Sequence, residues 1–352
     1  MLDVSASLPS SPEGITAEWL GRVLGTRFPA VTVEKLRISR ILWGTATKVL
    51  LDVTYAGRPG GPVPTNLCLK AGLDDRLQKV SSDAIHAMEA RFYGQLRDRL
   101  DTPAPRSYYA SVDEAGRTGL VILEDLTAAG CRFVEPGDVL TPDQVACGLG
   151  HQARWHAATW GTTPADLPGV KVGSMTRKAA KLFFREDYWD AHFAQEDVPR
   201  YPQHLQDPHT LYQAFQELWA YDDGVVHCFQ HGDAHLGNAF VRPGGDLGFV
   251  DWQCYCLGPW SYDVAYFISG ALTISDRRAH EAGLLRYYLD QLALAGGPRI
   301  SFDDAWRDYV RHLVHGLIWT MTPKVMQPAE RSRVMSDRHV AAVEDHGVIT
   351  GA

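Results

Sequence analysis

The residues best suited to chemistry lie between His231 and Asp251. The sequence there contains H-x-D-x-x-x-x-N, formed by His231, Asp233 and Asn238, and Asp251 follows Asn238 after thirteen positions. Phosphoryl transfer needs a carboxylate that orients the attacking hydroxyl and accepts its proton, and oxygen ligands that hold Mg²⁺ against the phosphates. Asp233 is suited to the first task, and Asn238 and Asp251 are suited to the second. The pattern therefore indicates phosphoryl-transfer chemistry.

A β-hairpin is expected to position two of these residues. Residues 248–250 predict a strand that leads into Asp251, and the turn-forming residues 242–246 separate this strand from the one after Asn238. Pairing of the two strands would bring Asn238 and Asp251 near each other. The alternative to a catalytic role for the whole motif is a purely structural one, a polar turn that caps a hairpin.

The segments around this motif predict two lobes. Branched apolar residues predict five strands, at residues 36–42, 48–55, 66–71, 108–112 and 119–123. Apolar residues at helical spacing predict a helix over residues 82–100, and beyond residue 126 the pattern is helical, with the clearest start at Thr141. We therefore predict an α+β fold with an antiparallel N-terminal lobe over residues 1–126 and a mainly helical C-terminal lobe over residues 127–352.

The motif resembles a known superfamily. HGDAHLGN followed by VDWQ is similar to the catalytic and metal motifs of the aminoglycoside phosphotransferases and choline kinases. DWQ in place of D-F-G, followed by DVAYF, most resembles the ecdysteroid-kinase-like branch. The resemblance implies a two-lobed protein-kinase-like fold. It also implies an ATP- and Mg²⁺-dependent kinase that phosphorylates a hydroxyl of a small molecule, such as an antibiotic, a steroid-like compound or another alcohol, with ATP bound in the cleft between the lobes.

The same resemblance implies a role for each motif residue. Asp233 would orient the acceptor hydroxyl as the catalytic residue, and Asn238 and Asp251 would hold one or two Mg²⁺. We expect His231 to be structural, buried and hydrogen-bonded so that the loop keeps its shape. Asp263 would accept backbone N–H bonds from that loop.

The N-terminal half contains the partners expected for ATP. Lys70 lies near the end of the third predicted strand, and Glu89 lies nineteen positions later in the predicted helix. This is the order of a lysine that contacts the α- and β-phosphates and a glutamate that holds it. Glu124, Asp125 and Leu126 resemble the family's hinge, whose backbone would hydrogen-bond the adenine.

The loop between the first two strands departs from the kinase pattern. It has a single glycine, Gly44, where kinases have G-x-G-x-x-G. We expect Thr45 or Thr47 to assist in binding the phosphates. The reduced loop also motivates an alternative, a non-catalytic nucleotide-binding protein built on the same fold.

A second alternative is a metallohydrolase in which His231, Asp233 and His235 bind a metal as an H-x-D-x-H cluster. Nothing else in the sequence has a zinc-type spacing such as H-E-x-x-H. Among the six cysteines, only Cys254 and Cys256 are close together, and C-x-C matches neither zinc nor redox spacings. We expect reduced and mostly buried thiols.

Composition excludes several partners. The 352 residues carry a net charge of -8 and no Lys/Arg run, so the charge pattern of a nucleic-acid-binding protein is missing. The longest nearly apolar run, residues 264–274, is too short to span a bilayer, and the first residues do not resemble a secretory signal. We expect a cytoplasmic enzyme, monomer or homodimer, whose partner is a small-molecule substrate and which binds neither nucleic acid nor membrane.

Overall fold

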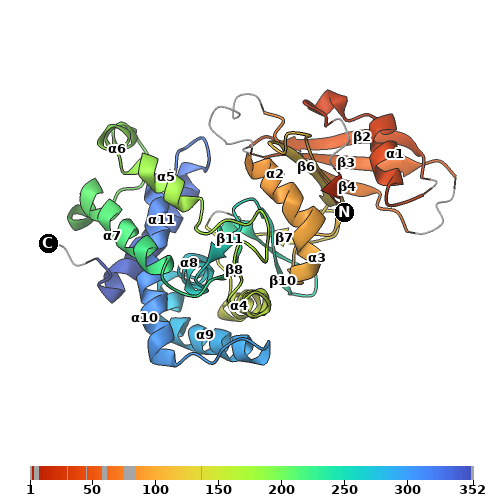
Figure 1. Cartoon of the computed structure of the whole chain (residues 1–352). Coiled ribbons are helices and arrows are strands. Elements are labelled where there is room, and N and C mark those ends of the chain that lie inside the picture. The colour runs from red at the N-terminus through yellow and green to blue at the C-terminus, as the bar shows by residue number, and fades with distance from the viewer. Residues whose placement is uncertain are drawn as a thin grey trace. The chain divides into compact units, whose positions relative to one another are not determined.

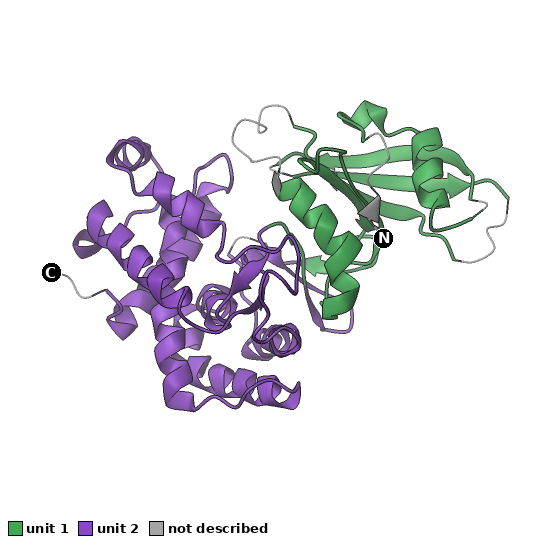
Figure 2. Cartoon of the chain, viewed as in Figure 1, with its two compact units in different colours: residues 1–132, 249–253 green, residues 133–248, 254–352 purple. Residues whose placement is uncertain are grey.

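The chain forms two compact units. The computed structural model describes residues 2–3, 8–29, 31–44, 46–57, 62–74, 84–135 and 137–349 (Figure 1). Figure 2 shows unit 1, residues 1–132 and 249–253, and unit 2, residues 133–248 and 254–352. The short segment that carries Asp251 thus belongs to unit 1, together with the N-terminal part of the chain.

Unit 1 is built on a six-stranded sheet of order β1-β5-β6-β4-β3-β2. Its strands are β1 (Leu2–Asp3), β2 (Val33–Leu42), β3 (Thr47–Tyr55), β4 (Asn66–Ala71), β5 (Ser107–Val112) and β6 (Gly119–Glu124). Only β1 pairs in parallel, with β5, and the other neighbours are antiparallel. The five predicted strands are confirmed, with each end within three residues of the prediction, and β1 is an addition to them.

Alternating burial explains why these residues form a sheet with a single core face. In β3, Thr47, Val49, Leu51 and Val53 are buried, and the residues between them are partly exposed. Helix α1 (Ala17–Gly25), whose N-cap is Thr16, contributes further apolar side chains to the same core.

The predicted helix over residues 82–100 is confirmed from residue 84 onward, and residues 82 and 83 lie outside the described part of the chain. It consists of α2 (Ala84–Arg91), a π-helical turn (Phe92–Leu96) and α3 (Arg97–Leu100), which lie along the sheet (Figure 1). A Cβ at Gly119 of β6 would lie 2.5 Å from the carbonyl oxygen of His86. Glycine therefore permits close approach of the helix that carries Glu89.

Unit 2 is mainly helical. Its helices are α4 (Pro142–Ala158), α5 (Thr176–Phe183), α6 (Glu186–Phe193), α7 (Pro208–Asp222), α8 (Ser261–Ala271), α9 (Ile274–Leu294), α10 (Phe302–His312) and α11 (Ala329–His346), with the 3₁₀ segment η5 (Leu313–Met321). Five further short strands belong wholly or partly to this unit: β7 (Arg132–Phe133), β8 (Cys228–Gln230), β9 (Ala239–Val241), β10 (Leu247–Phe249) and β11 (Cys256–Gly258). The predicted α+β class is confirmed.

The hairpin predicted after Asn238 is also present. Strands β9 and β10 are neighbours in a sheet of order β10-β9-β7. The turn between them is closed by hydrogen bonds from Arg242 N to Asp246 O and from Gly245 N to Arg242 O, each 2.8 Å. The thiols differ in part from expectation: all six cysteines are reduced, but only Cys228 and Cys256 are buried. None of the helices in the described part of the chain has both the length and the hydropathy that a bilayer span requires.

Helix α8 is the centre of unit 2. Every one of its eleven residues is buried, and it packs against α4, α9, α10, α11 and η5. Complete burial explains why its sequence, SYDVAYFISGA, has no charged face and a single acidic residue. That residue, Asp263, and the nearby Tyr266 both belong to the candidate site described below.

Buried histidines beside α8 should make unit 2 sensitive to acid. Burial, reinforced by the charge of Arg338, lowers the pKa of His339 to about 3. An unfolded histidine titrates near 6.5. The stabilisation is therefore complete above about pH 6.5 and is lost as the pH falls toward 3, because only the unfolded chain takes up the proton.

We expect the free energy of unfolding to fall by about 1.4 kcal/mol per buried histidine between about pH 7.5 and about pH 5.5. Urea unfolding followed by tryptophan fluorescence at both pH values measures this loss. His339→Gln should reduce it, and substitution of the exposed His280 should not. An unchanged pH dependence in His339→Gln would contradict the assignment of the effect to this residue.

Candidate functional site

Lys70 forms the centre of a buried charge cluster in unit 1. Its Nζ lies 2.6 Å from Glu89 Oε2 and 2.8 Å from Asp251 Oδ1. The side chains of Lys70 and Glu89 are 5% and 3% exposed, whereas that of Asp251 is 23% exposed. Burial alone would lower the pKa of Lys70, but the carboxylates of Asp251 and Glu89 outweigh burial and raise it. The ammonium group of Lys70 thus contacts two carboxylates, and Asp251 is the more solvent-exposed of the two.

The position of Asp251 is fixed by the residues around it. Its φ of 66° lies in the left-handed region, which aspartate tolerates better than most residues. Trp252, next in the chain, stacks on Phe92 with ring centroids 4.2 Å apart, and its Nε1 donates to the carbonyl oxygen of Phe249 at 2.9 Å. Phe249 N donates to Pro103 O at 3.1 Å. The tryptophan in place of the D-F-G phenylalanine therefore anchors the segment within unit 1.

Two buried polar atoms near the residues predicted to bind the nucleotide have no hydrogen-bond partner among the described residues. They are Glu89 Oε1 and Thr47 Oγ1. Burial raises the pKa of Glu89 against the opposing charge of Lys70. Gly44 lies in a bend before β3, and Thr45 lies outside the described residues. Because an unsatisfied buried polar atom costs about 1–3 kcal/mol, both atoms are candidates for contact with a ligand.

The predicted hinge residues form a turn after β6. Asp125 O accepts from Ala129 N, and Leu126 O accepts from Cys131 N, each at 2.9 Å. Glu124 is the last residue of β6. Since a carbonyl oxygen can accept two hydrogen bonds, the backbone of this turn keeps the capacity to bind a further donor.

In unit 2, Asp263 holds the loop that runs from His231 to Asn238. Its Oδ2 accepts from His231 N at 2.6 Å and its Oδ1 accepts from Gly232 N at 3.0 Å. Gly232 has a φ of 79°, and a Cβ there would lie 2.1 Å from the carbonyl oxygen of Cys254. Only glycine fits this position. The loop backbone is therefore constrained by the hydrogen bonds to Asp263 and by the close carbonyl group of Cys254.

Asp233 has four neighbours, of which His235 Nε2 lies 3.7 Å from its Oδ2, and it remains accessible. Its N–H donates to His231 Nδ1 at 3.2 Å, and Asn238 Nδ2 donates to Asp233 O at 2.9 Å and to Asp233 Oδ2 at 3.2 Å. The Tyr266 hydroxyl lies 3.5 Å from Asp233 Oδ1. One third of the Asp233 side chain is exposed. Because the nitrogen of Asn238 is committed to Asp233, its oxygen is the atom available as a ligand.

His231, Asp233 and His235 do not form the H-x-D-x-H metal cluster that the sequence left open. Within the described ranges, the only group of histidine, cysteine and carboxylate side chains close enough to share an ion lies elsewhere in unit 2. His235 Nδ1 instead accepts from Gly237 N at 2.9 Å and caps the short 3₁₀ helix η4 (Leu236–Asn238). This geometry removes the basis of the metallohydrolase alternative.

His156 lies in the core of unit 2. It is fully buried, its Nδ1 is 2.8 Å from the Tyr288 hydroxyl, and its Nε2 is 3.8 Å from Asp263 Oδ2. Burial lowers the pKa of His156, and Asp263 only partly opposes this. A neutral His156 provides no countercharge, so the backbone N–H groups of the loop are what stabilise the carboxylate of Asp263.

Sequence reasoning missed two residues behind Asp233. Trp319 Nε1 donates to the Tyr266 hydroxyl at 2.6 Å, and that hydroxyl faces Asp233. Tyr266 could have been found, because it lies three residues after Asp263 and therefore on the same side of α8. Trp319 comes from η5 through a long-range contact, for which the sequence gives no local signal.

Comparisons with known proteins place the chain in a family. The model of the ecdysteroid kinase-like family matches residues 76–295, which is more than half of the chain. A search among curated proteins found no match.

Three solved structures are similar in fold. The choline kinase of Cryptosporidium parvum Iowa II has a TM-score of 0.56 at 12% identity, covering 95% of this chain and 98% of that one. Spectinomycin phosphotransferase APH(9)-Ia, in complex with ADP and spectinomycin, has a TM-score of 0.51 at 12% identity, covering 94% and 99%. The choline kinase LicA of Streptococcus pneumoniae has a TM-score of 0.50 at 11% identity, covering 94% and 98%. Together with the family match, they confirm the predicted kinase-like fold: the chain belongs to the ecdysteroid kinase-like family and is a small-molecule kinase.

Proposed function

We propose that this chain transfers the γ-phosphate of ATP, in a Mg²⁺-dependent reaction, to a hydroxyl group of a small molecule. The observation that carries the proposal is the cluster in unit 1, where Lys70 contacts both Glu89 and Asp251. A buried lysine held by a helical glutamate and a carboxylate after a strand is the arrangement that kinases use for ATP phosphates and metal. ADP in the similar spectinomycin phosphotransferase supports nucleotide binding.

Unit 1 would bind the nucleotide. Lys70, held by Glu89, would contact the α- and β-phosphates. The buried hydroxyl of Thr47 has no partner in the described part of the chain, and it would donate to a phosphate oxygen after a small local movement. The backbone of residues 124–126, which ends β6 and forms the following turn, would bind the adenine.

The donor set fits Mg²⁺. Asp251 offers a carboxylate and Asn238 an amide oxygen, and hard oxygen ligands are what this cation prefers. The cluster of Lys70, Glu89 and Asp251 carries one positive and two negative charges, so a cation near the exposed Asp251 is electrostatically favoured. When bound, Mg²⁺ would neutralise charge on the phosphates.

Asp233 would orient the acceptor hydroxyl and accept its proton. Its carboxylate is held by Asn238 on one oxygen and faces the Tyr266 hydroxyl on the other, so its direction is set before a substrate binds. A positioned general base contributes about 10²- to 10⁴-fold to the rate. We propose an antibiotic, a steroid-like compound or another alcohol as the acceptor.

The test is ATP consumption by the full chain against a chemically diverse library of hydroxyl compounds, with and without EDTA, followed by mass spectrometry of the product. We expect Mg²⁺-dependent ADP formation and a phosphorylated product with at least one compound. Thermal stabilisation by Mg·ATP without product across the library would instead support a non-catalytic nucleotide-binding protein. Absence of both stabilisation and turnover would refute the proposal.

Tyr266→Phe should lower kcat about tenfold and leave the KM for ATP unchanged. The substitution removes the hydroxyl that faces Asp233 Oδ1 and accepts from Trp319 Nε1. A neutral hydroxyl that donates to a carboxylate favours its charged form, so its loss should also shift the acidic limb of the kcat–pH profile to higher pH.

Tyr288→Phe is the matched control. It removes a buried hydroxyl that contacts His156 and makes no hydrogen bond to Asp233. If both variants changed kcat alike without a change in pH profile, Tyr266 would be a packing residue and not a positioning residue.

A further inference from the structure

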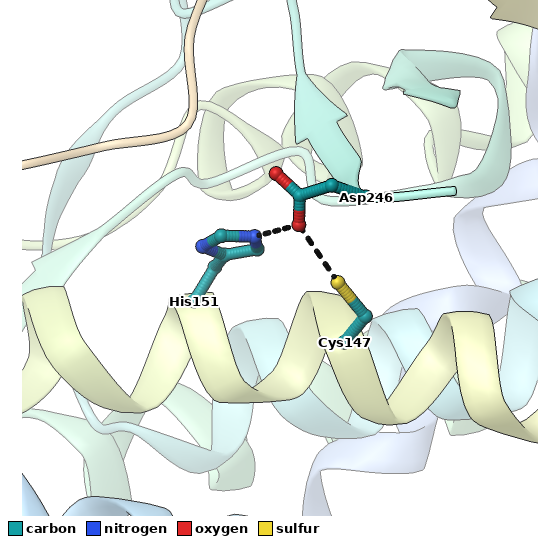
Figure 3. Close-up of side chains that lie close together, drawn as sticks. All are labelled: Cys147, His151 and Asp246. Carbon is teal, nitrogen blue, oxygen red and sulfur yellow. Dashed lines mark hydrogen bonds and ion pairs between the residues drawn. The ribbon is translucent and has the colours of Figure 1, made fainter. Parts of the chain in front are cut away.

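Three side chains of unit 2 outside the proposed phosphotransfer site gather donors of the kinds that bind metal ions (Figure 3). Cys147 Sγ lies 3.1 Å from Asp246 Oδ1, and His151 Nε2 lies 3.0 Å from the same oxygen. The three ligand atoms all lie within 4.8 Å of one another. No other such group exists in the part of the chain that the structure describes. The three side chains point toward one another from two elements (Figure 3).

The fold brings these side chains together from a helix and a hairpin that pack on each other. Cys147 and His151 are one turn apart on α4 and therefore share a face of the helix. Asp246 ends the turn between β9 and β10, and the next residue, Leu247, donates its N–H to Cys147 Sγ at 3.4 Å. The helix and the hairpin are tightly packed at this point, because a Cβ at Gly148 would lie 3.0 Å from the Leu247 side chain.

We propose that Cys147, His151 and Asp246 form a site for a single Zn²⁺, with water as the fourth ligand. Thiolate sulfur, imidazole nitrogen and carboxylate oxygen are the donors that zinc takes, and a sulfur–nitrogen pair selects against Mg²⁺ and Ca²⁺. On binding, the Cys147 thiol loses its proton to solvent as the Zn–S bond forms. The proton of neutral His151 moves from Nε2 to Nδ1, so that Nε2 can bind the metal.

Arg154 opposes Zn²⁺ binding, so its substitution should raise the Zn²⁺ affinity, whereas substitution of a ligand should lower it. Its Nη2 contacts His151 Nδ1, which requires a lone pair on that nitrogen. Ligation through Nε2 instead requires a proton on Nδ1, so Zn²⁺ must displace Arg154. Arg154 is exposed, and such a surface contact costs little to break. Its cationic guanidinium also repels the ion.

A bound ion would connect the β9–β10 hairpin to α4. The hairpin is the connection in sequence between Asn238 and Asp251, and the ion would hold its turn through Asp246. Zn²⁺ that binds only the folded chain should therefore raise the unfolding temperature in a concentration-dependent way.

The test is competition for Zn²⁺ between a chromophoric chelator and the full chain, after removal of metal with EDTA. We expect one tight Zn²⁺ per chain. Cys147→Ser and Asp246→Asn should each weaken binding by at least the about 10- to 100-fold that loss of a ligand's outer-shell partner costs, and Arg154→Ala should tighten binding several-fold. Equal thermal unfolding of all variants without metal would show that they are folded.

The matched controls are Cys131→Ser, which alters another partly exposed thiol, and Asp251→Asn, which alters the proposed Mg²⁺ site. Neither should change Zn²⁺ affinity. Absence of stoichiometric binding would overturn the proposal, and so would unchanged affinity in Cys147→Ser. Since the readout is metal affinity and not phosphotransfer, failure here is distinguishable from failure of the proposed function.

Discussion

Replacing Asp233 by asparagine should strongly reduce turnover and leave nucleotide binding intact. The amide is nearly the same size as the carboxylate but cannot accept the proton of the acceptor hydroxyl. We expect kcat to fall by about 10²- to 10⁴-fold, because that is the usual contribution of a positioned general base. The affinity for Mg·ATP should stay within about twofold, because Asp233 is not among the proposed phosphate or metal ligands. Single-turnover product formation and calorimetric titration with Mg·ATP measure the two quantities separately.

Asp223→Asn is the control for this substitution. Asp223 is an exposed carboxylate of the same unit and pairs with Arg177 at 2.7 Å, so its loss should change neither quantity. Wild-type turnover in Asp233→Asn would remove Asp233 from its proposed role. Loss of ATP affinity together with a lower unfolding temperature would show that the residue mainly holds the loop.

Local patterns in the sequence were enough to predict five of the six strands in the sheet of unit 1 and their order along the chain. In β3, alternation from Thr47 to Val53 marks both the strand and its buried face. The turn between β9 and β10 is rich in glycine and proline and was predicted for the same reason. These features depend on residues that are close together in the chain. The periodicity of apolar residues reports on such local relations.

Long-range contacts could not be predicted in the same way. The motif identifies Asp263 as a supporting residue, but its bonds to the N–H groups of His231 and Gly232 depend on how α8 is packed. The ring of Trp319 reaches Tyr266 from an element 53 positions away. Similarly, Cys147 and His151 have metal-binding spacing on a helix, yet only the folded hairpin places a carboxylate beside them.

Removal of the Asp251 carboxylate should have the largest effect on nucleotide affinity. Lys70 would keep Glu89 as a partner, while the cluster would lose one of its two negative charges and its exposed oxygen ligand. Asp251→Asn is the more informative variant, since asparagine tolerates the left-handed backbone at a φ of 66°. Asp251→Ala adds a backbone cost of about 1–2 kcal/mol. We expect both variants to lose Mg²⁺-dependent ATP binding and at least about 10²-fold in turnover, and only the alanine variant to lose stability as well.

Asp101→Ala separates the two effects. Asp101 is another residue of unit 1 with positive φ, 46°, but it lies at the C-terminal end of α3 and has no proposed ligand. The alanine there should lower the unfolding temperature much as Asp251→Ala does, with Mg·ATP affinity unchanged. If Asp251→Asn bound Mg·ATP as the wild type does, Asp251 would be a structural partner of Lys70, and the metal would need another carboxylate. If Asp251 is a metal ligand, its substitution makes ATP binding insensitive to Mg²⁺; if Asp251 only pairs with Lys70, ATP binding still depends on Mg²⁺. The Mg²⁺ dependence of ATP binding therefore distinguishes the two roles, and turnover alone does not.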